Sequence, residues 1–190
     1  MSALTDLRKN TPDSDDETHM IIDLLETVPD INERLGNNPI IIDIGTAHGL
    51  LVKAFRGAGL TNTRGFDANP RFSEEFPGVV ETAFATKLPL ETKSADIAIS
   101  SRLFSDPNFR RGEGAFIRGR INPDSQIAMA CNLVITEVAR VLREGGLYVI
   151  SDDFLVPTVG RNNQFLSSIY THPSKLGEVL QRTKVPFSKI

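Results

Sequence analysis

The sequence predicts an α/β fold with a doubly wound, mostly parallel sheet, and the order of its hydrophobic segments is the main reason. Short apolar runs, rich in β-branched residues, alternate with segments whose apolar residues recur at helical spacing. Glycine, proline and asparagine separate the two kinds of segment. The expected strands are residues 40–44, 64–67, 79–82, 95–100 and 147–151. Right-handed crossovers bring the carboxyl ends of such strands to one edge of the sheet, where ligands bind.

Helical spacing and capping residues predict the connecting helices. The expected helices are residues 18–28, 49–57, 70–76, 124–143 and 174–182. In the second of them, the pattern places Leu50, Leu51, Ala54 and Phe55 on the inner face. A last strand is expected over residues 185–190. The loop over 102–122 is longer than a compact connection requires, which favours a lid or a binding role.

Composition limits the protein to a few classes. A chain of 190 residues is sufficient for one domain, expected over residues 18–190 and preceded by a mobile, acidic tail over 1–17. The net charge of −3 disfavours a nucleic-acid partner. A lone cysteine, no basic-then-apolar signal and no apolar run of about 20 residues predict a cytoplasmic protein without a membrane segment.

The strongest local motif is Asp43–Gly49, Asp-Ile-Gly-Thr-Ala-His-Gly, between an expected strand and an expected helix. Residues without bulky side chains let the backbone turn sharply and let a ligand approach it closely. A tight turn without a ligand would need the same residues. Asp67 ends the second expected strand, where a carboxylate in nucleoside-binding sheets accepts hydrogen bonds from ribose hydroxyls. Asp67 also begins a good turn and helix-cap sequence, and both roles can hold together.

Four segments in register resemble the motifs of class I S-adenosylmethionine (SAM)-dependent methyltransferases. They are residues 43–49, 65–70, 88–101 and 137–146, the last ending in Gly145-Gly146 before the fifth expected strand. The resemblance spans residues 40–151 and implies a Rossmann-like fold, SAM as the cofactor and methyl transfer as the reaction. The family usually continues with a two-strand hairpin. About 40 residues follow the fifth strand here, so the C-terminal strand region is either shortened or a natural short form.

The resemblance also implies a set of cofactor-binding residues. They are Asp43, Gly45, Thr46, Ala47, Gly49, Asp67, Ala68, Phe84, Ala85 and Ser100. The loop backbone would face the methionine end of SAM, with Asp43 near its amino group, and Asp67 would hold the ribose. Ala68, Phe84 and Ala85 would lie beside the adenine. Ser100 would lie near the sulfonium. Phe84 stands where many family members place an acidic residue.

Residues for catalysis and acceptor binding are less well defined by the sequence. SAM carries the reactive group, so a dedicated catalytic side chain is optional. If a base is needed, His48, Asp152 and Asp153 are the candidates. Arg102 and Arg110 belong to an arginine-rich loop that could bind an anionic substrate or be a solvated basic loop. No set of residues with the spacing of metal ligands is evident, so no metal is expected.

Two other functions stay open at this point. One is a non-catalytic SAM-binding module that works with a partner subunit or as a homodimer. The other is a nicotinamide-dependent oxidoreductase, whose Gly-x-Gly-x-x-Gly fingerprint falls on Gly45, Ala47 and Leu50, so that two of three glycines are missing. The sequence does not identify the methyl acceptor; the negative net charge favours a small molecule over a nucleic acid.

Overall fold

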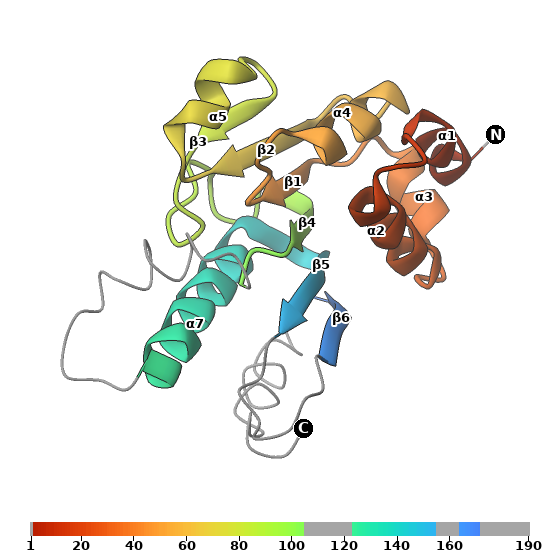
Figure 1. Cartoon of the computed structure of the whole chain (residues 1–190). Coiled ribbons are helices and arrows are strands. Elements are labelled where there is room, and N and C mark those ends of the chain that lie inside the picture. The colour runs from red at the N-terminus through yellow and green to blue at the C-terminus, as the bar shows by residue number, and fades with distance from the viewer. Residues whose placement is uncertain (1, 105–122, 155–163, 172–190) are drawn as a thin grey trace.

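A six-stranded sheet lies at the centre of the structure, a computed structural model that describes residues 2–104, 123–154 and 164–171 (Figure 1). The strand order is β3-β2-β1-β4-β5-β6. The strands are β1 (Ile41–Ile44), β2 (Thr63–Asp67), β3 (Val80–Thr82), β4 (Ala95–Ser101), β5 (Leu142–Phe154) and β6 (Gln164–Thr171). The first five are parallel, and β6 is antiparallel to β5. The prediction of a doubly wound, mostly parallel sheet is confirmed.

Side chains alternate between the two faces of the sheet, and each face has its own apolar core. In β4, Ile97 and Ile99 belong to the core under the N-terminal helices, whereas Ala98 belongs to the core under α7 (Pro123–Val141). The helices of the first face are α1 (Ala3–Asn10), α2 (Asp16–Glu26), α3 (Ile31–Gly36) and α4 (Leu50–Gly57). Figure 1 shows α1, α2 and α3 on the opposite side of the sheet from α7. A short helix, α5 (Pro70–Glu75), packs beside β3.

The N-terminal segment differs from the expected mobile tail. Residues 3–10 form α1, whose Ser2 N-cap side chain accepts a hydrogen bond from the Thr5 amide. Leu4 and Leu7, spaced as one helical face, are buried against the neighbouring helices. Two leucines looked too few to order a polar segment, but α2, α3 and α4 provide an apolar surface that the local sequence does not reveal.

The C-terminal part of the sheet also differs from expectation. The helix ends at Val141, and β5 begins at once, so Gly145-Gly146 lies within the strand beside a register shift opposite β4. The sequence pattern placed these glycines between the helix expected at 124–143 and the strand expected at 147–151. Strand β6 was not predicted, and it forms an antiparallel ladder with β5 over residues 164–171. The helix expected at 174–182 and the strand expected at 185–190 lie outside the described residues.

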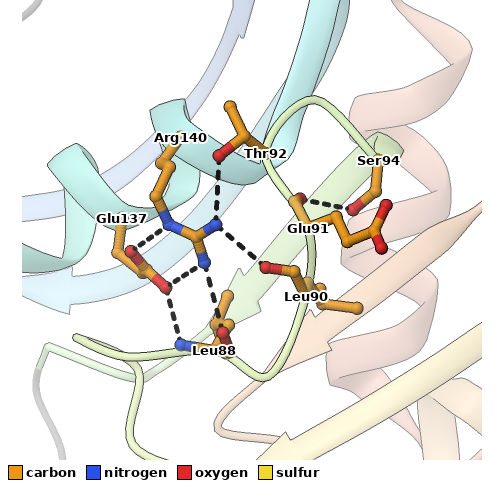
Figure 2. Close-up of polar contacts among 7 residues, drawn as sticks. All are labelled: Leu88, Leu90, Glu91, Thr92, Ser94, Glu137 and Arg140. Carbon is orange, nitrogen blue, oxygen red and sulfur yellow. Dashed lines mark hydrogen bonds and ion pairs between the residues drawn. The ribbon is translucent and has the colours of Figure 1, made fainter.

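A polar cluster fastens α7 to the loop before β4 (Figure 2). The Arg140 guanidinium donates to the carbonyl oxygens of Leu88 and Leu90 at 3.2 and 2.9 Å and to the Glu137 carboxylate at 2.7 and 2.8 Å. Glu137 Oε1 also accepts from the Leu88 amide at 2.7 Å. These hydrogen bonds, led by the one from Arg140, hold the pKa of Glu137 below its ordinary value. The loop therefore has a fixed path into β4.

Replacing Glu137 by alanine is expected to lower the free energy of unfolding by about 2 kcal/mol, because it removes charge-assisted hydrogen bonds from a mostly buried carboxylate. Urea denaturation at pH 7 measures the change. As a control, Arg71→Ala breaks an exposed ion pair with Glu75 and should leave stability unchanged. Equal stability of wild type and Glu137→Ala would show that the cluster contributes nothing.

Candidate functional site

The sheet changes winding direction between β1 and β4, and a hollow lies at their carboxyl ends. The hollow has a volume of about 110 Å³. Its lining residues come from β1 and the loop after it, the end of β4, α2 with its N-cap, and α4: Asp15, Glu17, Thr18, Ile21, Asp43, Gly45, Thr46, Ala47, His48, Leu50, Leu51 and Ser101. In open α/β sheets a crevice at this switch point is the usual ligand site. We call this hollow the switch-point pocket.

The loop between β1 and α4 has an uncommon backbone. Gly45, Ala47 and Gly49 all have positive φ, at 78°, 45° and 67°. The amides of Gly45 and Thr46 donate to the Phe66 carbonyl oxygen at 2.8 and 3.1 Å, which ties the loop to β2. Left-handed conformation disfavours residues with a Cβ, so Ala47 is strained. The resulting turn brings the loop backbone to the surface of the pocket.

Gly49 is required for space as well as for conformation. An ideal Cβ there would lie 2.5 Å from Val79 Cγ1 and 3.2 Å from Val80 Cγ2. Gly49→Ala is therefore expected to lower the free energy of unfolding by about 2–3 kcal/mol, measured by urea denaturation. The matched variant Ala47→Gly should raise stability by up to about 1 kcal/mol, because it relieves the strain at positive φ. A Gly49→Ala protein as stable as wild type would contradict this view of the loop.

Asp43 is a buried carboxylate at the floor of the pocket. Its exposed fraction is 4%, and its Oδ2 accepts a hydrogen bond from Thr46 Oγ1 at 2.5 Å. Burial raises the pKa of Asp43 from 3.8 to about 7; the Thr46 hydrogen bond opposes this rise, and the negative charges of Asp67 and Glu17 add to it. A cation in the pocket would stabilise the ionised form.

Asp67 holds the loop from the end of β2. Its Oδ2 accepts from the Ala47 amide and its Oδ1 from the Asn69 amide, each at 2.9 Å. Each carboxylate oxygen can accept a further hydrogen bond, so Asp67 can bind the loop and a ligand hydroxyl together. Asn69 caps α5 through the Arg71 amide, so the expected turn and cap roles are also present.

His48 and Leu50 lie at the rim of the pocket. The His48 ring contacts Phe72 and Phe76 edge-on, with centroids 5.0 and 5.6 Å apart, so α5 fixes the orientation of an exposed imidazole. Leu50 is 53% exposed and lines the pocket, so the prediction that it lies on the inner face of its helix was wrong. Val52 is buried in its place, since it packs toward β2.

The two serines at the end of β4 point to opposite faces of the sheet. Ser100 is fully buried on the α7 face, where its Oγ lies 3.0 Å from the Tyr148 hydroxyl. It does not line the pocket. Ser101 lines it from the face covered by α2. The Ser100 side chain therefore points away from the switch-point pocket, although the sequence analysis expected it among the cofactor-binding residues.

Two of the three residues expected beside the adenine are exposed, and the third is buried. Ala68 is exposed just beyond Asp67, and Phe84 is 49% exposed. Ala85, by contrast, is buried in the core under α7, with 4% exposure, so its side chain is not available to a ligand. Phe84 pairs with Lys87 in a narrow turn that holds the phenyl ring at the surface.

Of the nominated arginines, the structure describes Arg102 and not Arg110. Arg102 Nη1 lies 2.8 Å from Glu17 Oε1, so an ion pair links the end of β4 to α2 at the pocket. The backbone of Asp152 and Asp153 continues β5, opposite Leu166 and Phe165, but their side chains lie outside the described part. Within the described ranges no three potential metal ligands gather, and no helix has the length and apolar character to cross a membrane.

A second, larger hollow of about 400 Å³ lies at the amino ends of β1 and β4. Its cations are already engaged: Arg143 pairs with Asp96, and Arg34 pairs with Asp30 and donates to the Gly145 carbonyl oxygen. This edge of a parallel sheet is not where ligands bind. The switch-point pocket is therefore the candidate site.

Part of the pocket lining was missed by sequence reasoning. Asp15, Glu17, Thr18 and Ile21 belong to the start of α2, and half of them fell in the expected tail. Nothing in the local sequence places α2 over the end of β1. Ser101 could have been found, because strand alternation puts it on the face of Asp43 once that face is known to carry the pocket.

The sheet order, with a hollow at the switch point, defines a Rossmann-like fold. No protein-family model and no curated protein sequence matches the chain.

Solved structures do match. The PH0226 protein of Pyrococcus horikoshii OT3 is 16% identical, with a TM-score of 0.51, over 92% of this chain and 84% of that one. A Haloferax volcanii protein, described as a methyltransferase in complex with the Trm112 activator, is 18% identical over 74% of this chain and 54% of its own, with a TM-score of 0.46. A SAM-dependent methyltransferase of Mesorhizobium loti is 17% identical over 77% and 66%, with a TM-score of 0.42. The chain spans about half of the length of the Haloferax protein and about two thirds of that of the Mesorhizobium protein.

Proposed function

We propose that this chain binds SAM at the carboxyl ends of β1, β2 and β4 and transfers its methyl group to a small-molecule acceptor. One observation carries the proposal: the strained loop after β1 lies between two carboxylates, buried Asp43 in the switch-point pocket and Asp67 bonded to the Ala47 amide. The pocket volume suits the amino-acid end of SAM, and Asp67 lies where the ribose of the same molecule would follow.

The charges in the pocket favour a cationic ligand group. Asp15, Glu17 and Asp43 line it, and Arg102 pairs with one of the three, Glu17. An ammonium group near Asp43 would stabilise the carboxylate form that burial disfavours. A dinucleotide would instead bring a pyrophosphate to this loop, and the nearby carboxylates would repel it. The pocket therefore supports SAM over a nicotinamide cofactor.

When bound, SAM supplies a methyl group on a positively charged sulfur. Asp43, Asp67 and the loop after β1 would hold the cofactor, and the methyl group would be available for direct transfer to an acceptor. The protein's part is alignment and exclusion of water. His48 lies at the pocket, held by Phe72 and Phe76, where it can take a proton that the acceptor releases.

Isothermal titration with SAM, S-adenosylhomocysteine and NAD tests the proposal directly. We expect micromolar binding of the first two and none of NAD. NAD binding without SAM binding would refute the cofactor assignment. SAM binding without turnover on a broad panel of small-molecule acceptors would instead indicate a binding module.

A further inference from the structure

The side chain of Ser101 has an unexplained polar atom. Its Oγ is buried, and no hydrogen-bond partner is found for it in the part of the chain that the structure describes. A buried hydroxyl without a partner destabilises a protein, and native structures rarely keep one without a reason. Ser101 lines the switch-point pocket, so the reason lies in what the pocket binds.

The register of the sheet gives Ser101 its position. Ile44 of β1 pairs with Ser100 of β4, so Ser101 lies one step beyond the last pair, where β1 has turned away at Gly45. Because Ser101 follows Ile97 and Ile99 at intervals of two, its side chain lies on the face of α2 and Asp43. The residue as a whole is only half-buried. Rotation about χ1, between staggered positions, can thus turn the hydroxyl into the pocket.

We propose that Ser101, rather than Ser100, is the β4 residue that contacts the ligand, and that its hydroxyl accepts a hydrogen bond from the ammonium group of the ligand's amino-acid part. The inference rests on the proposed SAM site. The carboxylates of Asp15, Glu17 and Asp43 around the same pocket attract that ammonium group, and a serine oxygen accepts readily from it. The bound ligand supplies the partner that the free protein lacks.

Two ligands and four variants test the inference by isothermal titration and thermal unfolding. S-Adenosylhomocysteine contains the amino-acid part, whereas 5′-methylthioadenosine keeps the nucleoside and lacks that part. Ser101→Ala should bind S-adenosylhomocysteine about fivefold to tenfold more weakly and bind methylthioadenosine as wild type does. Its Tm should stay equal to that of wild type or rise by about 2–4 °C, since an unpaired buried hydroxyl has been removed. Ser101→Thr, which keeps a hydroxyl, should retain most of the affinity.

Ser100→Ala is the matched comparison in the same strand. It removes the hydrogen bond with Tyr148, so its Tm should fall while the affinities for both ligands stay unchanged. Ser94→Ala, in the turn before β4, should change neither quantity. Equal losses for both ligands in Ser101→Ala, no loss, or a selective loss in Ser100→Ala would overturn the assignment. If wild type bound neither ligand, the proposed SAM site itself would fail.

Discussion

Replacing Asp67 by alanine is expected to weaken binding of SAM by about a hundredfold, the largest effect on affinity that the structure predicts. Two hydrogen bonds from ribose hydroxyls to a carboxylate together contribute about 3 kcal/mol, which corresponds to that factor. The variant also leaves the Ala47 amide without the hydrogen bond that it donates to Asp67 Oδ2 at 2.9 Å in the wild-type structure. Isothermal titration with SAM measures the loss.

Affinities for two ligands, one with and one without the amino-acid part, distinguish the role of Asp67 from that of Ser101. Because methylthioadenosine keeps the ribose, Asp67→Ala should weaken its binding as strongly as that of S-adenosylhomocysteine. Asp23→Ala serves as a control, since Asp23 is an exposed carboxylate of α2 that pairs with Arg8. An Asp67→Ala protein that binds SAM like wild type would refute the ribose assignment.

Replacing Asp43 by asparagine is expected to stabilise the protein above pH 7. Burial raises the pKa of Asp43 from 3.8 to about 7, so the folded state holds the proton more tightly than the unfolded state. The stability that this difference confers is present below pH 3.8 and is lost as pH rises toward 7. A shift of about three pKa units corresponds to up to ~4 kcal/mol. Asparagine does not ionise, and its Oδ1 can still accept from Thr46 Oγ1.

Urea denaturation between pH 4 and pH 8.5 measures this effect. The stability of Asp43→Asn relative to wild type should be lowest near pH 4, grow between pH 4 and pH 7, and stay constant above. An asparagine variant that is less stable than wild type at pH 8 would contradict the raised pKa.

The same carboxylate is expected to couple ligand binding to protons. If the ammonium group of SAM binds beside ionised Asp43, wild-type affinity should fall by up to about tenfold for each pH unit below 7. Titrations in buffers of different ionisation enthalpy would then detect proton release on binding. Asp43→Asn should bind more weakly at pH 8 and lose this pH dependence. Under the proposed function, Asp43 lowers the stability of the free protein and strengthens ligand binding, a common relation at functional sites.

Much of this fold could be predicted from the sequence because local patterns determine the elements that carry it. From the run expected as a strand at 40–44, residues 41–44 form β1 and are buried on both faces, as a central parallel strand requires. The small residues at 45, 47 and 49 adopt the positive φ values of a sharp loop. Asp67 ends β2 where the pattern placed it, and its carboxylate reaches the loop. The strand, the loop and the end of β2 depend on residues that are close in sequence.

Tertiary structure decided what covers the loop and which side chains face the pocket. Leu4 and Leu7 of α1 pack against an apolar surface that more distant helices provide, and α2 brings Glu17 to Arg102, 85 positions away in the chain. Side chains alternate along β4, so only one of Ser100 and Ser101 can line the pocket. It is Ser101, because α2 covers the face to which Ser101 points. Local sequence determines strands, turns and their ends. The packing of distant helices determines the faces, because burial is a property of the assembled chain.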